Sequence, residues 1–325
     1  LARHRAGLRD RGATSMSPGR QGAAARLLVT GASGFVGAHV RDAVRAGVFG
    51  DGGFIALPPG TDLNERRAVE EAVAAARPDL VLHLAAQSFV PRSFEAPAET
   101  FAVNLLGTLN LLQAMKLAGF AGRMVYVSSG DVYGRVEDAQ LPVDEDTPAA
   151  PRSPYAVSKI AAEQLCLQWH RTEALDVTIA RPFNHIGPGQ DAVFAIPSIA
   201  SQVRAIADGR QPPEIEVGDI DTTRDFTDVR DVVAAYAAMF ARGRAGATYV
   251  VASGRERRIR DLLAVMCGLA GVEPRIRQDP ARMRPAEQRR MVASAARLSN
   301  DTGWSPRISL ERTLSDILEK VDGTS

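Results

Sequence analysis

Tyr155 and Lys159 are four residues apart at the start of a predicted helix, in the sequence Tyr155-Ala-Val-Ser-Lys159. Side chains at this spacing lie one turn apart on the same helix face. A tyrosine with its ordinary pKa of about 10 is a poor base at neutral pH. A neighbouring ammonium stabilises the phenolate and brings that pKa toward the working range, so the pair could transfer a proton. The alternative is an ordinary solvent-exposed helix pair.

A polar turn follows the predicted strand at 123–128 and contains Ser128-Ser129-Gly130-Asp131. Ligands bind at the carboxyl ends of parallel strands, so these side chains are expected to face a crevice. The Ser129 hydroxyl could donate a hydrogen bond to a reacting carbonyl or alkoxide oxygen, whereas Ser128 is expected to shape the backbone turn. Asp131 fits three roles equally: a general base, an acceptor for a substrate hydroxyl, or a turn residue.

A glycine-rich loop, Gly31-Ala-Ser-Gly34-Phe35-Val36-Gly37, follows a short apolar strand and opens a helix. Glycine lets the backbone approach a pyrophosphate closely, and the helix start presents free N–H groups and a positive dipole end to that anion. The loop therefore predicts dinucleotide binding by Gly31, Gly34, Phe35, Val36 and Gly37. The alternative is a tight turn between a strand and a helix.

Residues after the next two strands would complete a dinucleotide pocket. The Asp62 carboxylate of Asp62-Leu63 could accept a hydrogen bond from an adenine amino group, or cap the helix that begins near Glu65. The residues Leu84-Ala85-Ala86 would let a cofactor lie close. His83, within an apolar strand, is expected to be a core residue.

The choice between NAD and NADP stays open at this point. An acid at the end of the second strand would bind a ribose 2′-hydroxyl, and an arginine would accept a 2′-phosphate. Pro58-Pro59-Gly60 occupies that stretch and supplies neither.

The composition of the 325-residue chain excludes several classes of protein. A hydrophobic fraction of 45% is enough for a substantial core, and a net charge of +1 gives no strong field for nucleic acid or a membrane surface. Two cysteines, Cys166 and Cys267, make no disulfide framework and have no metal-ligand spacing. No apolar run reaches the roughly 18 residues of a spanning helix. We therefore expect a soluble, cytoplasmic protein without a metal site.

Predicted strands and helices alternate from Arg26 onward. Strands are expected at 26–30, 54–57, 79–85, 123–128 and 176–181, and helices at 35–46, 65–77, 97–119 and 155–173. Continuous apolar strands between helices are typical of a parallel sheet covered on both faces. The sequence thus predicts an α/β fold with a Rossmann-type, doubly wound parallel sheet.

Three parts are expected along the chain. Residues 1–25 are Arg-rich without an apolar period and are expected to be a disordered extension, with a transit peptide as the alternative. Residues 26–187 are expected to form the dinucleotide-binding domain, to which 225–255 returns. Residues 188–224 and 256–325 are expected to be mainly a smaller, discontinuous substrate-binding region. Later helices are predicted at 196–208, 228–242 and 310–321, and strands at 214–217 and 247–252.

As an ordered set, the motifs of this chain resemble the extended short-chain dehydrogenase/reductase family, in its nucleotide-sugar branch. The set comprises TGASGFVG from Thr30, Asp62-Leu63, HLAAQS from His83, NLLGT from Asn104, SSGDVYG from Ser128, SPYAVSK from Ser153 and RPFNHIGPGQ from Arg181. The resemblance implies a Ser129-Tyr155-Lys159 triad, with Asn104, Tyr155 and Lys159 also contacting NAD or NADP. It also implies a homodimer through the helices at 97–119 and 155–173.

Within that branch, further pieces are most similar to reductases of GDP-linked 6-deoxy-4-keto sugars, and next to GDP-mannose 4,6-dehydratases. These pieces are FNHIGPGQ from Phe183, TRDFTDVRD from Thr223, RPAEQ from Arg284 and GWSPRISLERTLSDIL from Gly303. Dehydratases usually carry Thr and Glu where this chain has Ser129 and Asp131. The resemblance implies reduction of GDP-4-dehydro-6-deoxy-D-mannose to GDP-D-rhamnose by NAD(P)H. A dehydratase, an epimerase and a non-catalytic dinucleotide-binding protein are the alternatives.

A nucleotide-sugar substrate needs groups for its diphosphate, ribose and base. Arginine suits the diphosphate because its planar fork binds two oxygens at once. By resemblance Arg224 and Arg284 would hold the diphosphate, although Arg224 could instead pair with Asp225 or Asp228. His185 is expected to have a packing role, with contact to the substrate as the alternative, and Val193 and Phe194 would pack near the base. The candidate substrate-binding residues are Gln87, Ser129, Asp131, Asn184, Val193, Arg224, Arg284 and Glu287.

Overall fold

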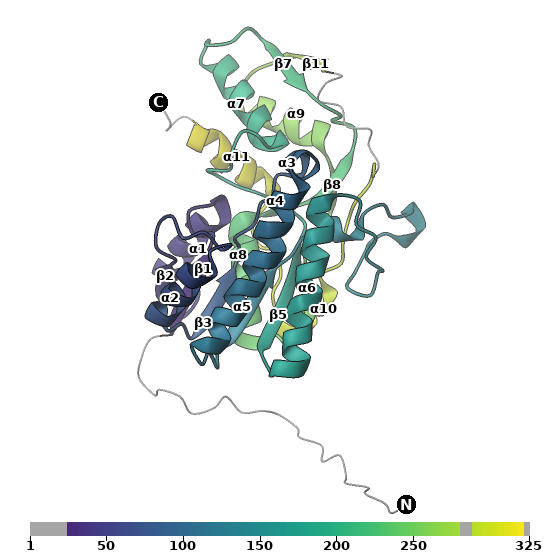
Figure 1. Cartoon of the computed structure of the whole chain (residues 1–325). Helices are drawn as coiled ribbons and strands as arrows, with labels where there is room; N and C mark the ends of the chain where they lie inside the picture. Colours follow the sequence, from purple (N-terminus) through teal and green to yellow (C-terminus); the bar gives the residue numbers. More distant parts are fainter. Residues whose placement is uncertain (1–24, 280–287, 322–325) are drawn as a thin grey trace, which may run out of the picture.

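A six-stranded parallel sheet forms the centre of the molecule (Figure 1). The computed structural model describes residues 25–279 and 288–321. The strand order is β2-β1-β3-β4-β5-β9, and all neighbouring strands run parallel. The order reverses between β1 and β3, which in such sheets opens a crevice at the carboxyl ends. The strands are β1 (Arg26–Thr30), β2 (Gly53–Ala56), β3 (Leu80–His83), β4 (Arg123–Val127), β5 (Asp176–Pro182) and β9 (Thr248–Val251). The predicted Rossmann-type fold is confirmed.

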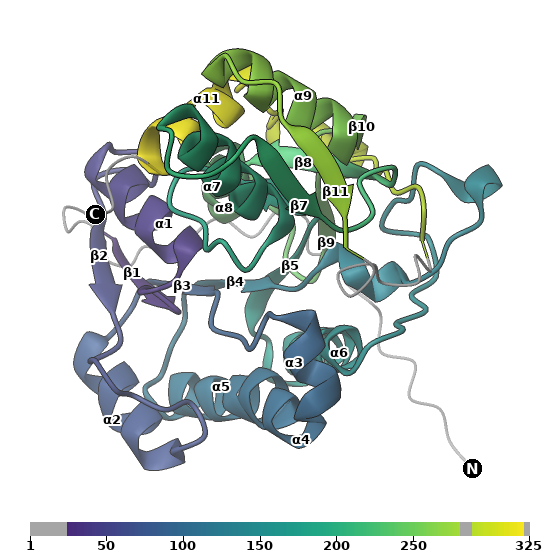
Figure 2. The same cartoon turned by 90° about the horizontal axis from the view of Figure 1, so that it is seen from above.

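Helices cover both faces of this sheet, as the view along it in Figure 2 shows. One face carries α2 (Arg66–Ala76), α5 (Gly107–Leu117) and α6 (Pro154–Glu173), and the other carries α1 (Phe35–Arg45), α8 (Val229–Arg242) and α10 (Ala296–Thr302).

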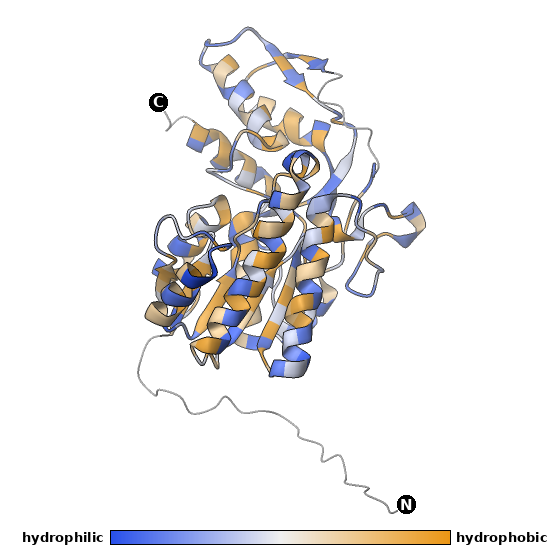
Figure 3. Ribbon diagram, in the orientation of Figure 1, coloured by the Kyte–Doolittle hydropathy of each residue, from blue (hydrophilic) through white to orange (hydrophobic). Residues whose placement is uncertain are grey.

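The two helical layers explain why the strands are apolar throughout. Successive side chains of a strand point to opposite faces. In β1, Leu27 and Val29 pack in the core cluster beneath α1 and α8, whereas Leu28 packs in the cluster beneath α2 and α5. All three side chains are fully buried. Figure 3 shows the central strands coloured mainly as hydrophobic, which places the sheet as the internal layer.

The helix predicted at 97–119 is divided in the structure. It consists of α4 (Pro97–Phe101), a π-helical turn η1 (Ala102–Leu106) and α5. In η1 the buried side chain of Asn104 binds the backbone N–H and carbonyl of Gln87, and its amide also donates to the hydroxyl of Ser158. The turn therefore joins α5 to the loop after β3 and to α6. Single π turns of this kind are frequent at functional sites.

A smaller region lies above the carboxyl ends of the strands in Figure 1. Its helices α7 (Ala195–Ala207), α9 (Ile259–Ala270) and α11 (Leu310–Val321) share a separate hydrophobic core. Its strands form the sheets β10-β8-β6 and β11-β7. These strands are β6 (Asn184–Ile186), β7 (Glu214–Val217), β8 (Thr223–Asp228), β10 (Glu256–Arg258) and β11 (Arg275–Gln278).

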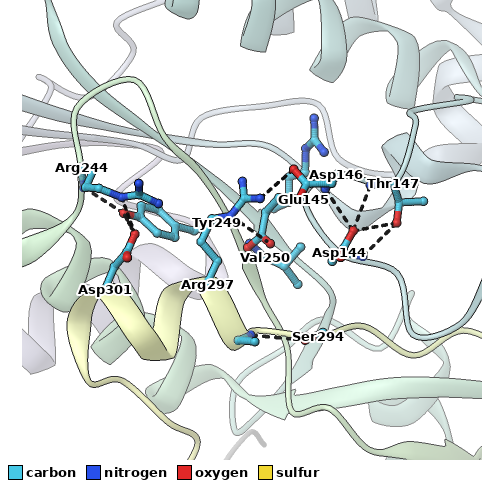
Figure 4. Close-up of polar contacts among 12 residues, drawn as sticks. Asp144, Glu145, Asp146, Thr147, Arg244, Tyr249, Val250, Ser294, Arg297 and Asp301 are labelled. Carbon is cyan, nitrogen blue, oxygen red and sulfur yellow. Dashed lines mark hydrogen bonds and ion pairs between the residues drawn. The ribbon is translucent and has the colours of Figure 1, made fainter.

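The outer edge of β9 is covered by other parts of the chain (Figure 4). The Val250 N–H donates to the Glu145 carboxylate over 2.8 Å, and Arg297 binds Asp146 over 2.7 Å. An open strand edge is a template for pairing with another chain. Because the Glu145 carboxylate accepts from the Val250 N–H, that N–H is not available to pair with a strand of another chain.

The predicted strands and helices of the central sheet are confirmed to within a few residues, apart from the division of the helix at 97–119. The helices α3 (Val90–Glu95), α9 and α10 and the strands β6, β8, β10 and β11 were not predicted. The strands β6, β10 and β11 have only three or four residues and are too short to display a period, and β8, with the sequence TRDFTD, has a single apolar residue. The division into two regions remains a prediction, and α10, within 256–325, packs against α8 and β9 of the larger one. The extension predicted at 1–25 lies outside the described residues except for Ala25. In the described ranges no helix is both long and apolar enough to span a membrane.

Candidate active site

A cleft of about 1850 Å³ lies at the carboxyl ends of the central strands, where the smaller region faces the sheet. Its lining combines Gly31, Tyr155 and Lys159 of the larger region with Phe194 and Arg224 of the smaller one. A second hollow of about 460 Å³ borders the outer edge of β9, and its arginines are already paired with carboxylates (Figure 4). The larger cleft is therefore the candidate site.

The glycine loop has the geometry needed for close approach of a pyrophosphate. Gly31 has φ +72°, and a Cβ there would lie 2.8 Å from the backbone nitrogen of Ala85. A Cβ on Gly37 would lie 2.5 Å from the carbonyl oxygen of Gly31. Among the described residues no side chain caps the start of α1, and its first turn holds no acid. The free N–H groups and the dipole of α1 thus fit the diphosphate of NAD(P).

The stretch after β2 places Asp62 and Leu63 in the wall of the same cleft. The Asp62 carboxylate accepts hydrogen bonds from the backbone N–H and side-chain amide of Asn64, over 2.9 and 3.0 Å. The N-cap of α2 is Glu65, so the alternative role of Asp62 as a helix cap is not found.

Arg41, on α1, was not among the predicted residues. Its Nη2 donates to the carbonyl of Ala32 over 3.2 Å, and its guanidinium lies 5.3 Å from the ring centroid of Phe54 on β2. A positive charge thus lies beside the glycine loop on the side of β2. The signal in the sequence is an arginine in the second turn of the helix, since long helical side chains point back toward the N-terminus.

Tyr155 and Ser129 meet in the cleft. The phenol of Tyr155 is hydrogen-bonded to the Ser129 side chain. Burial raises the pKa of Tyr155, the charge of Asp131 raises it further, and the bond with Ser129 lowers it. Contrary to expectation, Lys159 is not among the groups that shift this pKa. The phenol keeps its proton at neutral pH.

The position of the Lys159 ammonium explains why it does not lower the pKa of Tyr155. Its Nζ donates to the carbonyl of Val127, at the end of β4, over 2.8 Å and lies 5.2 Å from the ring centroid of Tyr126. Burial lowers the pKa of Lys159 to about 8, and the negative charge of Glu163 acts in the opposite direction. The side chain remains an ammonium at neutral pH.

Arg224 faces the cleft from β8, as a diphosphate-binding residue should. Its Nη1 donates to the carbonyl of Thr223 over 2.7 Å. Burial lowers the pKa of Arg224. The alternative partners are occupied: Asp225 accepts from Ser253, and Asp228 binds Arg230.

The other predicted substrate residues divide into those in the cleft and those elsewhere. Asp131, Asn184, Val193 and Phe194 line the cleft and are exposed. Gln87 does not line it, because its amide nitrogen donates to Thr100 and its amide oxygen accepts from the Phe89 N–H. Asn104, predicted to contact cofactor, is also absent from the lining and instead supports the loop at Gln87. Arg284 and Glu287 lie outside the described residues.

Two histidines and Ser128 behave as supporting residues. His83 is buried and bonded to two threonine hydroxyls, and burial lowers its pKa to about 3, which confirms the core prediction. His185 stacks on Phe35, with ring centroids 6.3 Å apart, and also lines the cleft, so its packing role remains a prediction. Ser128 was expected to shape a turn, but its hydroxyl binds the buried carboxylate of Glu163. In the part of the chain that is described, no cluster of His, Cys, Asp or Glu could hold a metal.

The family model described as GDP-mannose 4,6 dehydratase matches residues 60–317. A GDP-6-deoxy-D-mannose reductase from Pseudomonas aeruginosa is 51% identical over 90% of this chain and 96% of its own. The solved structure of RMD from Pseudomonas aeruginosa complexed with NADPH has a TM-score of 0.86 at 49% identity, covering 92% of this chain and 99% of that one. A dTDP-glucose 4,6-dehydratase from Streptomyces venezuelae with NAD bound has a TM-score of 0.80 at 27% identity, covering 92% and 97%.

Gly37→Ala is expected to weaken NAD(P)H binding by about tenfold or more, because the new Cβ would lie 2.5 Å from the carbonyl oxygen of Gly31 and would push the glycine loop away from the start of α1. Gly268→Ala on α9 is the matched control, since nothing lies within 4 Å of its added Cβ. Fluorescence titration with NADPH measures both variants. Equal dissociation constants for the two would show that the glycine loop does not hold the dinucleotide.

Proposed function

This chain belongs to the family described as GDP-mannose 4,6 dehydratase, within the extended short-chain dehydrogenases/reductases, and we propose that it is an NAD(P)H-dependent reductase of a nucleotide sugar. The substrate is GDP-4-dehydro-6-deoxy-D-mannose, and the product is GDP-D-rhamnose. The observation that carries the proposal is the cleft itself, which brings Tyr155, Ser129 and Lys159 together beside the glycine loop. The high identity to a GDP-6-deoxy-D-mannose reductase supports the choice of substrate.

The reduction of the 4-keto group requires one hydride and one proton. NAD(P)H, when bound, supplies the hydride to C4 and leaves as NAD(P)⁺. The Tyr155 Oη gives its proton to the forming alkoxide, and the Ser129 hydroxyl donates a hydrogen bond to the same oxygen. Lys159 holds a positive charge at the end of β4, where it binds the nicotinamide ribose and stabilises the phenolate left on Tyr155. Arg224 and Asn184 bind the diphosphate from the opposite wall.

The identities of Ser129 and Asp131 favour a reductase over the redox-neutral reactions of the family, because dehydratases usually carry Thr and Glu at these two positions. A dehydratase first oxidises C4 and so needs a base at the position of Tyr155, whereas a reductase needs an acid there. Asp131, whose charge raises the pKa of Tyr155, lies in the cleft where it can accept a substrate hydroxyl.

Tyr155→Phe is expected to lower kcat for keto-sugar reduction by about 10²–10⁴-fold, because the general acid is lost. NADPH affinity is expected to stay within about threefold, since the ring still fills the same buried position. Loss of reduced-nicotinamide absorbance with the keto-sugar measures turnover, and fluorescence titration measures binding.

The same assay separates the alternatives. Stoichiometric oxidation of NAD(P)H supports the reductase. Formation of a keto-sugar from GDP-mannose alone would identify a dehydratase, and unchanged absorbance with every nucleotide sugar would identify a non-catalytic protein. Wild-type turnover by Tyr155→Phe would exclude that residue as the proton donor.

Arg41 favours NADPH as the cofactor. Its guanidinium lies between the glycine loop and β2, on the side where the adenosine ribose is bound in this fold. A planar guanidinium binds phosphate oxygens in pairs. The neutral residues Pro58-Pro59-Gly60 offer no carboxylate that would repel a 2′-phosphate.

Arg41→Gln is expected to weaken NADPH binding by about ten- to hundredfold, because a hydrogen bond between two charged groups contributes about that much to affinity. The affinity for NADH, which has no 2′-phosphate, is expected to change by no more than about twofold. Arg45→Gln on the same helix is the control, because Arg45 is exposed and pairs with Asp42. Titration of each variant with both cofactors measures the selectivity. A parallel loss of NADH affinity would mean that Arg41 supports the loop rather than the 2′-phosphate.

A homodimer is the assembly that the exposed apolar residues support. Leu106 on η1 is 52% exposed and Val157 on α6 is 38% exposed. These segments pack against each other on the face that also carries α4 and α5 (Figure 1). Exposed apolar side chains on one helical face are typical of an interface between subunits.

Leu106→Lys combined with Val157→Lys is expected to convert the dimer to a monomer, because two charges would be buried at the interface. Leu269→Lys is the control, since Leu269 is also 52% exposed but lies on α9 of the smaller region. Sedimentation velocity measures the mass. An unchanged mass for the double variant would contradict this interface.

The location in the cytoplasm remains a prediction. Cell fractionation of the full chain tests it.

A further inference from the structure

A buried charged network lies directly behind the residues proposed to be catalytic. Glu163, on α6, is fully buried and one turn after Lys159. Arg181, on β5, donates to both of its carboxylate oxygens, with Nη2 at 2.7 Å and Nε at 3.0 Å. The Ser128 hydroxyl donates to the same carboxylate, and Arg181 Nη1 donates to the Tyr133 hydroxyl over 3.1 Å. Neither the sequence motifs nor the reaction described above gives this network a role.

The network holds both ends of the turn that carries Ser129. Ser128 immediately precedes Ser129, which is the N-cap of the 3₁₀ turn Gly130–Tyr133. Tyr133 ends that turn and stacks on Phe183, with ring centroids 5.9 Å apart. One carboxylate therefore reaches the start of the turn through Ser128 and its end through Arg181.

The network also determines the charges around Lys159. The groups near its ammonium are the carbonyl of Val127, the ring of Tyr126, the imidazole of His83, the thiol of Cys166 and the carboxylate of Glu163. Burial keeps His83 neutral, and burial raises the pKa of the Cys166 thiol, so the thiol also stays neutral at pH 7. Glu163 is thus the negative charge of this group that opposes the desolvation of Lys159.

We infer that Glu163 is a positioning residue with two effects, holding the Ser129 turn in place and keeping Lys159 as an ammonium. Replacing a buried charged pair by apolar residues often leaves the stability of a protein unchanged or raises it. A contribution to stability therefore does not by itself explain why this network is present. Its contacts with both the Ser129 turn and the Lys159 helix face indicate a role in the site. The first effect rests on the proposed reductase function, whereas the second concerns dinucleotide binding and does not.

The direction of the expected pH dependence follows from the sign of each charge. Burial lowers the pKa of Lys159 to about 8, and Glu163 raises it. Removing the negative charge leaves burial less opposed, so the pKa falls further and the ammonium is lost at a lower pH. If Lys159 binds the cofactor as an ammonium, NADPH affinity falls as the pH rises through this pKa.

Glu163→Gln tests the charge while keeping the shape of the side chain. The NADPH dissociation constant of the wild type is expected to rise above about pH 8, and that of Glu163→Gln to rise at least about one unit lower. Glu163→Asp keeps the charge but not the reach to Ser128, so it should restore the pH midpoint and not kcat. Ser128→Ala removes only the contact with the turn, and should lower kcat about tenfold without moving the midpoint.

Glu173→Gln, at the exposed end of the same helix, is the matched control, because Glu173 pairs with Lys116 outside the cleft. A wild-type pH midpoint in Glu163→Gln, with loss of activity that follows thermal stability in all variants, would overturn the inference. If Glu163→Gln does not fold, the inference would instead be overturned by a shifted pH midpoint of NADPH binding in Glu163→Asp or by an unchanged kcat in Ser128→Ala. A shifted midpoint in a chain that reduces no keto-sugar would refute the proposed function alone.

Discussion

The hydrogen bond from the Lys159 ammonium to the carbonyl of Val127, 2.8 Å long, joins α6 to the last residue of β4. Tyr155 lies one turn before Lys159 on that helix, and Ser129 lies two residues after Val127 in the chain. This contact therefore contributes, with the Glu163 network, to the distance between the phenol and the hydroxyl that meet in the cleft. An unpaired buried ammonium would cost several kcal/mol. The carbonyl, the Tyr126 ring and the Glu163 carboxylate offset that cost.

Desolvation then decides which groups of the site carry protons. Burial raises the pKa of Tyr155 and lowers that of His83, so Tyr155 is a phenol and His83 is a neutral imidazole. The ammonium of Lys159 keeps its charge at neutral pH because a carboxylate on the same helix compensates it. A site in this state is ready to give a proton to an oxygen that becomes negative. This is the requirement of carbonyl reduction.

Contact between backbone segments sets the position of a dinucleotide. Gly31 approaches the loop after β3 so closely that a Cβ would meet the nitrogen of Ala85 at 2.8 Å, and Gly37 allows the first turn of α1 to rest on Gly31. The loop after β3 is supported in turn by Asn104, whose amide lies in a π turn. These residues contribute shape rather than charge. The positive charges beside these segments, Arg41 next to the glycine loop and Arg224 in the wall of the cleft, come from an adjoining helix and from the second region.

The spacing of apolar residues and the positions of glycine and proline were sufficient to predict the central sheet, most of its helices and the glycine loop, because each depends on residues near one another in the chain. The Ser129-Tyr155-Lys159 set was implied by the resemblance of the ordered motifs, not by any single local pattern. The roles of Gln87, Asn104 and Ser128 could not be obtained in this way, since their hydrogen-bond partners come from other elements, with Ser128 and Glu163 35 residues apart. The same holds for the proton on Tyr155: a helical spacing suggested a pKa lowered by Lys159, but burial by the assembled fold raises it. Sequence determines which groups are available and their local geometry. Only the tertiary structure determines which of these groups are buried away from water, and this desolvation shifts their pKa values and so their protonation states.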